Sequence, residues 1–162
     1  FAAKFGKTAI VKLLCDHGAQ VNAKNNDGWT PLIEAVIGLT SNSNNSIQTN
    51  HEIISLLIQH SNVNEFDVSH CTALHYAARD GHIDSVRYLV SHGAKVNAQN
   101  VDKLTPLHLA AREGRVEITK FLLGHGADDA LKSSEGKTAK DIATEEGNHE
   151  VLQVLALHSK SH

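Results

Sequence analysis

The sequence predicts an all-α fold, a solenoid of short helical hairpins stacked in a row. Three observations predict it: an internal repeat, helix start and stop signals at fixed places within the repeat, and an apolar set with few aromatic residues. Thr72, Thr105 and Thr138 open similar segments and follow one another at intervals of 33 residues. Self-similarity at a period of this length is typical of stacked supersecondary units.

Each unit carries the signals of two short helices. Thr105 suits an N-cap, Pro106 suits the first helical position, and His108 lies where a side chain can bond back to the cap. Gly114 ends this helix, and Gly126 ends the apolar helix that follows. The small residues that let the helices approach closely are Ala77, Ala78, Ala110 and Ala111. One hairpin cannot bury its apolar faces alone, so neighbouring hairpins are expected to stack.

Two further copies of the unit depart from the regular spacing. One opens at Thr30 and resumes at His51, and the other is a partial copy over residues 1–24. We therefore predict a single domain over residues 1–162, with its last unit acting as a C-terminal cap. The predicted units are approximately residues 1–24 (partial), 25–64, 65–97, 98–130 and 131–162.

The second unit contains an insertion, which we place at residues 38–50. Thr30 and Glu52 are 22 residues apart, whereas the equivalent Thr105 and Glu117 are 12 apart. The stretch 38–46 is polar and rich in turn-forming residues, so a mobile loop between two helices is expected. The loop is either a tolerated surface insertion or a contact specific to one partner.

Composition and charge exclude several classes of function. The net charge is −3 with both signs interspersed, so no basic surface is expected and nucleic acid is not a predicted partner. No apolar run approaches the roughly 18–20 residues that span a bilayer, so membrane insertion is not expected. Residues 1–4 lack the features of a signal peptide, and Cys15 and Cys71 have no spacing partner. These features favour a cytoplasmic protein, with a nuclear location as the alternative.

The twelve histidines do not predict a metal site, and no catalytic motif is present. Repeats spread these rings along the stack, whereas a metal needs three or four ligands at one point. No Cys–His–Asp pairing and no glycine-rich phosphate loop can be identified. We expect no enzyme activity, no metal and no cofactor. The histidines expected to bond the last carbonyls of second helices are His17, His60, His92 and His125.

The period, the TPLHLAA segment, the glycine between helices and the GAxVNA turn resemble the ankyrin repeat. The resemblance covers nearly the whole chain apart from the insertion. It implies two antiparallel helices per unit, followed by a β-hairpin finger. Fingers and first helices would form a concave side and second helices a convex side. It also implies a non-catalytic scaffold that binds a partner protein or peptide in the concave groove.

The N-terminal end of the sequence leads to two further expectations. Residue 1 lies inside a first helix that lacks a polar N-terminal cap, so the chain is expected to be part of a longer array. Ile10 and Leu13 should then be less covered than their counterparts in later units.

A stack of this kind could serve instead as the targeting module of a larger enzyme, channel or secreted effector. A monomer is expected, with self-association through the N-terminal end as the alternative.

The resemblance also implies which positions face the groove. On the fingers they are Lys24, Asn26, Asp27, Trp29, Phe66, Val68, Ser69, Cys71, Gln99, Val101, Asp102, Leu104, Ser134, Glu135 and Lys137. On the first helices they are Lys4, Phe5, Arg79, Asp80, Arg112, Glu113, Glu145 and Glu146. Several are apolar where solvent is expected, which is typical of an interface.

Seven of these residues are the predicted partner-binding set: Trp29, Phe66, Val68, Arg79, Val101, Leu104 and Arg112. The two arginines would bond a carboxylate of the partner. Other interpretations remain open. Trp29 can pack on the neighbouring finger, Val101 and Leu104 can shield each other, and each arginine can pair with an adjacent acid.

Overall fold

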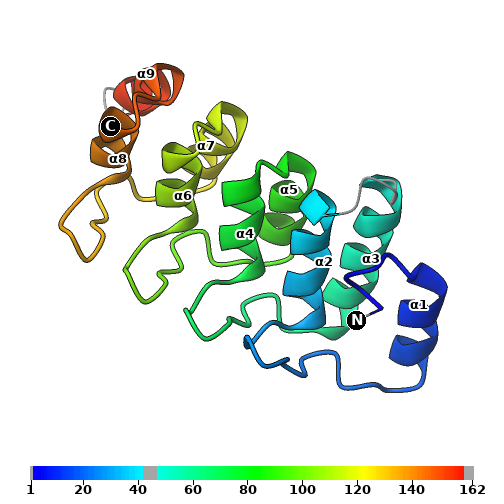
Figure 1. Cartoon of the computed structure of the whole chain (residues 1–162). Coiled ribbons are helices and arrows are strands. Elements are labelled where there is room, and N and C mark those ends of the chain that lie inside the picture. Colours follow the sequence, from blue (N-terminus) through cyan, green and yellow to red (C-terminus); the bar gives the residue numbers. More distant parts are fainter. Residues whose placement is uncertain (1, 42–46, 159–162) are drawn as a thin grey trace.

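The computed structural model describes residues 2–41 and 47–158, and these residues form nine α-helices, α1 followed by four stacked pairs (Figure 1). The first helices of the units are α2 (Pro31–Ser41), α4 (Ala73–Asp80), α6 (Pro106–Arg112) and α8 (Ala139–Glu145). The second helices are α1 (Thr8–Asp16), α3 (Ile47–His60), α5 (Ile83–Ser91), α7 (Val116–Gly124) and α9 (His149–His158).

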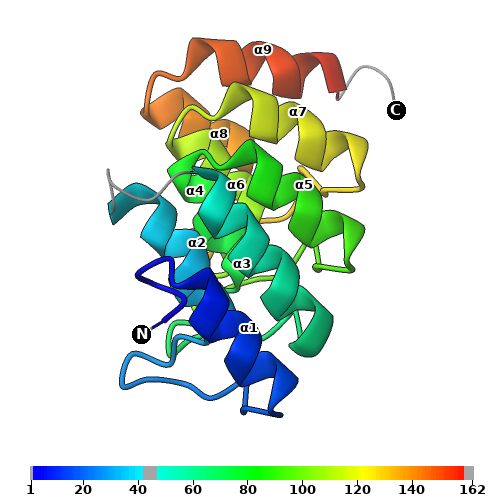
Figure 2. The same ribbon diagram turned by 90° about the vertical axis from the view of Figure 1, so that its right-hand side faces the viewer.

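The helices lie in two layers. The first helices contact one another in the order α2, α4, α6 and α8, and the second helices in the order α1, α3, α5, α7 and α9. Figure 2 shows the second helices side by side along the stack. Helices α1 and α9 lie at opposite ends of it, so each unit contacts only its neighbours. The prediction of an all-α repeat fold is confirmed.

The N-caps are formed as predicted, and they also join adjacent units. His75 Nδ1 accepts a hydrogen bond from the backbone N–H of Thr72 at 3.1 Å, which completes a capping box. Its Nε2–H donates to the carbonyl oxygen of Leu104, in the next unit, at 3.1 Å. His108 makes the same contacts one repeat later, and Asp141 closes the box of α8. Each histidine therefore caps its own helix and fixes the following loop.

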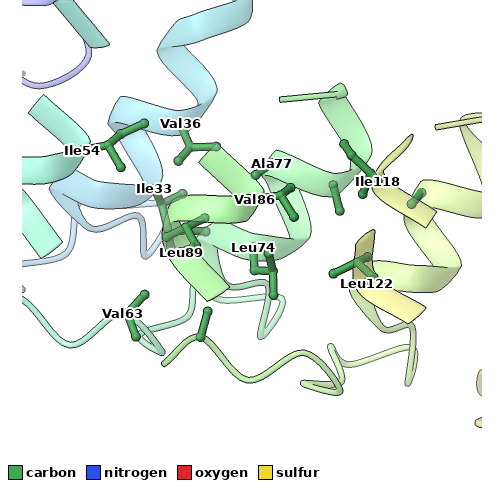
Figure 3. Close-up of a cluster of buried hydrophobic side chains, with 14 of the residues drawn as sticks. Ile33, Val36, Ile54, Val63, Leu74, Ala77, Val86, Leu89, Ile118 and Leu122 are labelled. Atoms are coloured by element: carbon green, nitrogen blue, oxygen red, sulfur yellow. The ribbon is translucent and has the colours of Figure 1, made fainter. Parts of the chain in front are cut away.

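The core runs without interruption through the stack. Leucines and isoleucines that face the interior of the two layers are almost fully buried, and the alanines predicted between the layers have no exposed surface. Figure 3 shows Leu74 of α4, Val86 and Leu89 of α5, and Ile118 and Leu122 of α7 directed into one continuous apolar layer. No helix within the described part of the chain is both long enough and apolar enough to cross a membrane.

The N-terminal unit differs from the expectation of a partial first helix. Residues 2–6 form hydrogen-bonded turns, and the first helix of the chain begins at Thr8. The carbonyl of Lys4 lies against Gly38, where a Cβ atom would be 2.9 Å from the carbonyl oxygen. The predicted loss of cover is confirmed at this end: Ile10 is 50 % exposed, whereas its counterpart Ile118 is 2 % exposed.

The expected loop over residues 38–46 is wrong for its first part. Helix α2 continues through Gly38 to Ser41, and α3 begins at Ile47. Gly38 does not end the helix because it is buried inside it, in contact with the backbone of Lys4. The insertion therefore lengthens both helices of this unit. The rest of the predicted loop, residues 42–46, lies outside the described residues.

The fingers are tight turns, and the predicted β-hairpins are not shown. Across residues 2–41 and 47–158 no strand forms, although an isolated antiparallel bridge joins Phe66 and Thr72. The third finger, which follows α5, closes through the N–H of Asn100, which donates to Leu104 O at 3.0 Å. Such short turns leave too few residues for a ladder of strand pairs.

Candidate protein-binding groove

Each finger is shaped by one polar side chain at its first turn position. Asn25 Oδ1 accepts hydrogen bonds from the backbone N–H groups of Asp27 and Trp29, each at 2.9 Å. Equivalent bonds recur in the later fingers, where the accepting side chains are Asp67, Asn100 and Ser133. Short Asx and Ser side chains favour this turn because they satisfy two backbone donors at once. These residues were not among those predicted to act in the site, although Asp67, Asn100 and Ser133 recur at intervals of 33 residues, which was a usable signal.

Neighbouring fingers are also joined to each other by their backbones. The N–H of Val101 donates to Ser69 O at 3.0 Å, and the N–H of Ser134 donates to Asp102 O at 2.8 Å. One bond of this kind at each step fixes the register of the fingers. The loops project along the side of the stack that carries the first helices (Figure 1). Equivalent positions of neighbouring fingers therefore follow one another along the stack.

The turn of each finger contains a residue with a positive φ angle. Gly28 and Gly136 occupy this position in the first and last fingers, each with φ of 77°. His70 and Lys103 occupy it in the middle fingers, with φ of 60° and 56°. A residue with a Cβ atom is strained in this left-handed region, whereas glycine is not.

Replacing Lys103 by glycine is therefore expected to stabilise the chain by about 0.5–1 kcal/mol. Glycine relieves the backbone strain at this position, and the larger conformational entropy that glycine loses on folding offsets part of that gain. Lys103 is exposed, so few contacts are lost with its side chain. Urea denaturation of Lys103→Gly and wild type measures the difference. A variant that is less stable than wild type would contradict the strain argument.

Three of the predicted binding residues form an exposed apolar surface on consecutive fingers. Phe66 is 43 % exposed, Val68 is 70 % exposed and Val101 is 56 % exposed. The Nζ of Lys24 lies 4.6 Å from the centroid of the Phe66 ring, and the His70 ring lies 4.6 Å from it on the same finger. Phe66 is therefore held in place while much of its surface stays open to solvent.

Trp29 and Leu104, by contrast, are partly buried. The Trp29 ring packs edge-on against the ring of Tyr76, with centroids 6.3 Å apart, and it contacts the core. Tyr76 in turn donates a hydrogen bond to the buried carboxylate of Asp67, and burial raises the pKa of Tyr76. These contacts give Trp29 and its neighbours a packing role at the base of the groove.

Both predicted arginines are paired with the acid that follows them. Arg79 Nε donates to Asp80 at 2.6 Å, and Arg112 Nε donates to Glu113 at 3.2 Å. The Arg79 guanidinium also lies 4.8 Å from the centroid of the Tyr76 ring. Both arginine residues stay partly exposed.

A cavity of about 360 Å³ lies at the C-terminal end of the groove, between the third and fourth fingers and the ends of α6 and α8. It brings together Leu104 and Arg112 of the predicted set. Its remaining lining residues are Asp102, Ser133, Ser134, Glu135, Lys137, Ile142, Glu145 and Glu146. Most of these were predicted to face the groove, but the sequence did not predict a cavity.

Comparison with known families agrees with the repeat geometry. A family model described as "Ankyrin repeats (many copies)" matches residues 1–44 and 74–123, more than half of the 162 residues. The chain belongs to the ankyrin-repeat family. A second model, described as "Ankyrin repeat", matches residues 27–68 of the same chain. A search of curated proteins finds no match.

Ankyrin repeats are generally protein–protein interaction modules, and their family is typically non-catalytic. Within residues 2–41 and 47–158, no group of three or more His, Cys, Asp and Glu side chains could hold a metal ion. Burial raises the pKa of both thiols, Cys15 and Cys71, which lowers the thiolate fraction that a nucleophile needs.

Proposed function

We propose that this chain is a non-catalytic scaffold that binds a protein partner in the concave groove formed by its fingers and first helices. One observation carries the proposal: Phe66, Val68 and Val101 are exposed apolar side chains on two consecutive fingers. Exposed apolar residues that adjoin one another are typical of interaction sites, and aromatic residues are common anchors of binding energy.

The rigidity of the fingers supports the same function. The turn side chains Asp67 and Asn100 fix the backbone of the two fingers that carry the apolar residues. The bond from Val101 N–H to Ser69 O joins those fingers to each other. A partner then binds a surface that is already formed, so little loop entropy is lost on association. Tight turns held in this way suit an extended segment or a protein surface as the ligand.

Replacement of Phe66 by alanine is expected to weaken partner binding about tenfold, since a truncated aromatic anchor costs roughly 1–2 kcal/mol. The helical melting curve should change little because much of the Phe66 ring is exposed. Affinity capture on the wild-type chain identifies the partner by mass spectrometry. Calorimetry on the purified pair then measures the dissociation constant for each variant.

Leu157→Ala is the matched control for this experiment. Leu157 is also a large exposed apolar residue, 66 % exposed, but it lies on α9 in the layer of second helices. Its removal should leave the affinity unchanged. Equal affinities for wild type, Phe66→Ala and Leu157→Ala would exclude the finger surface as the binding site.

A further inference from the structure

The cavity at the C-terminal end of the groove carries a net negative charge. Four carboxylates line it, those of Asp102, Glu135, Glu145 and Glu146, against two cations, Arg112 and Lys137. The lining charge is therefore −2. The cavity differs in this respect from the exposed apolar residues of the second and third fingers. It shares the third finger with Val101 through Asp102 and Leu104.

The two cations of the cavity are already neutralised by neighbouring acids. Arg112 Nε lies 3.2 Å from Glu113 Oε1. Lys137 Nζ lies 2.9 Å from Glu135 and 2.8 Å from Glu145. These pairs leave neither cation free to balance the other carboxylates in the cavity.

Asp102 and Glu146, in contrast, have no cationic partner within 4.0 Å among the residues that the structure describes. Asp102 lies at the tip of the third finger, whose position is fixed by the bond from Ser134 N–H to its carbonyl oxygen. Glu146 is the C-cap of α8. Two residues with fixed backbone positions and unpaired carboxylates thus line the same cavity, where a positive charge would be favoured.

The apolar part of the lining suits the stem of a long basic side chain. Leu104 and Ile142 contribute apolar surface between the acids. Lysine and arginine bury their methylene stems along such surface while the charged head stays near polar groups and water. The volume of about 360 Å³ is at the low end of the range for ligand pockets, so it admits a side chain rather than a large ligand.

We infer that this cavity binds a lysine or arginine side chain of the protein partner, next to the apolar surface formed by Phe66, Val68 and Val101. The inference rests on the proposed function, because the cavity continues the same groove. A partner carboxylate would meet a lining charge of −2 and is disfavoured. The partner segment therefore combines an apolar residue with a basic one.

Selection from a phage-displayed library of random dodecapeptides tests the inference. The wild-type chain should enrich peptides that contain Lys or Arg together with an apolar residue. Synthetic copies of the selected peptides should bind Asp102→Asn/Glu146→Gln about tenfold more weakly than wild type. Replacing the basic residue of the peptide by alanine should weaken binding to the wild-type chain about tenfold as well. The same peptide change should leave binding to the double variant almost unaffected, because the acids that contact the basic residue are already absent.

A second double variant separates local recognition from the general attraction of basic peptides to an acidic protein. Asp84→Asn/Glu150→Gln removes the same charge from exposed positions on α5 and α9, in the layer of second helices. It should bind the peptides as wild type does, and equal weakening in both double variants would overturn the inference.

The same selection distinguishes failure of the inference from failure of the proposed function. Peptides that lose affinity for Phe66→Ala but show no excess of Lys or Arg would overturn the basic subsite and leave the groove intact. Peptides that bind Phe66→Ala and both charge variants as tightly as wild type would overturn the groove itself.

Discussion

Replacement of Leu107 by alanine is expected to lower the free energy of unfolding by about 2–5 kcal/mol. Leu107 is 1 % exposed and lies on α6, which packs between α4 and α8. Its truncation leaves a cavity within the stack, and the surrounding helices can fill it only partly because they are fixed on both sides. Since each unit is stabilised mainly by its neighbours, a defect in α6 weakens two interfaces at once. Urea denaturation followed by circular dichroism measures the change.

Leu13→Ala provides the control, since it removes the same atoms from an exposed position on α1. Surface substitutions usually change stability by no more than about 0.5 kcal/mol. Two variants with the same loss of stability would contradict the assignment of Leu107 to the core. A loss confined to Leu107→Ala would confirm that the stack derives its stability from contacts between units.

The helical part of the fold could be predicted because its signals are local. Threonine at an N-cap, a histidine three residues later and a glycine after the last turn act within one helix, so their recurrence fixes helix positions. Thr72 and His75 form the predicted cap for this reason. The sequence could not show that His75 also bonds Leu104 in the next unit, because that contact depends on how closely the units pack.

The wrong expectation of a loop at residues 38–41 has a long-range cause. The composition of this stretch predicts a loop, and Gly38 is a usual place for a helix to end. In the structure Gly38 is inside α2, and the backbone of Lys4 occupies the space that a Cβ atom would need. A tertiary contact with the N-terminal segment therefore determines the role of this glycine, and a local pattern cannot reveal such a contact.

Most of the residues that line the cavity had been predicted to lie on the groove side, but the cavity itself could not be predicted. The repeat alignment placed Leu104 and Arg112 on the groove side, and the structure brings both to one cavity. The pairing of Arg112 with Glu113 was visible as adjacent opposite charges. The cavity itself depends on the spacing between two fingers, which is set by backbone bonds such as Ser134 N–H to Asp102 O. The sequence does not specify such distances.

The stability of the chain is expected to fall steeply between about pH 6.5 and pH 4, because His75 is buried in its neutral form. Burial lowers the pKa of His75 from 6.5 to about 4. Nδ1 accepts bonds from the N–H and the hydroxyl of Thr72, and Nε2–H donates to Leu104 O. A proton on Nδ1 would break the bond from the Thr72 N–H and would require the hydroxyl to turn from donor to acceptor, so the folded state resists protonation.

The direction of the effect follows from proton linkage. Between the folded pKa near 4 and the ordinary value of 6.5, the unfolded chain binds more protons than the folded one. The contribution of His75 is therefore complete above pH 6.5 and is lost as the pH falls to 4, a loss of about 3 kcal/mol. Burial also lowers the pKa of His108, so His108 likewise contributes a loss of stability as the pH falls.

Comparison with His75→Gln isolates this contribution, since other groups of the protein titrate over the same range in both chains. The variant should be less stable than wild type at pH 7, and the difference should shrink as the pH falls to 4. Urea denaturation at half-unit steps of pH measures both curves. Parallel curves would mean that His75 titrates alike in the folded and unfolded chains, which is incompatible with a buried imidazole whose Nδ1 accepts hydrogen bonds. A converging pair would show that the same ring that joins two units also makes the stack sensitive to acid.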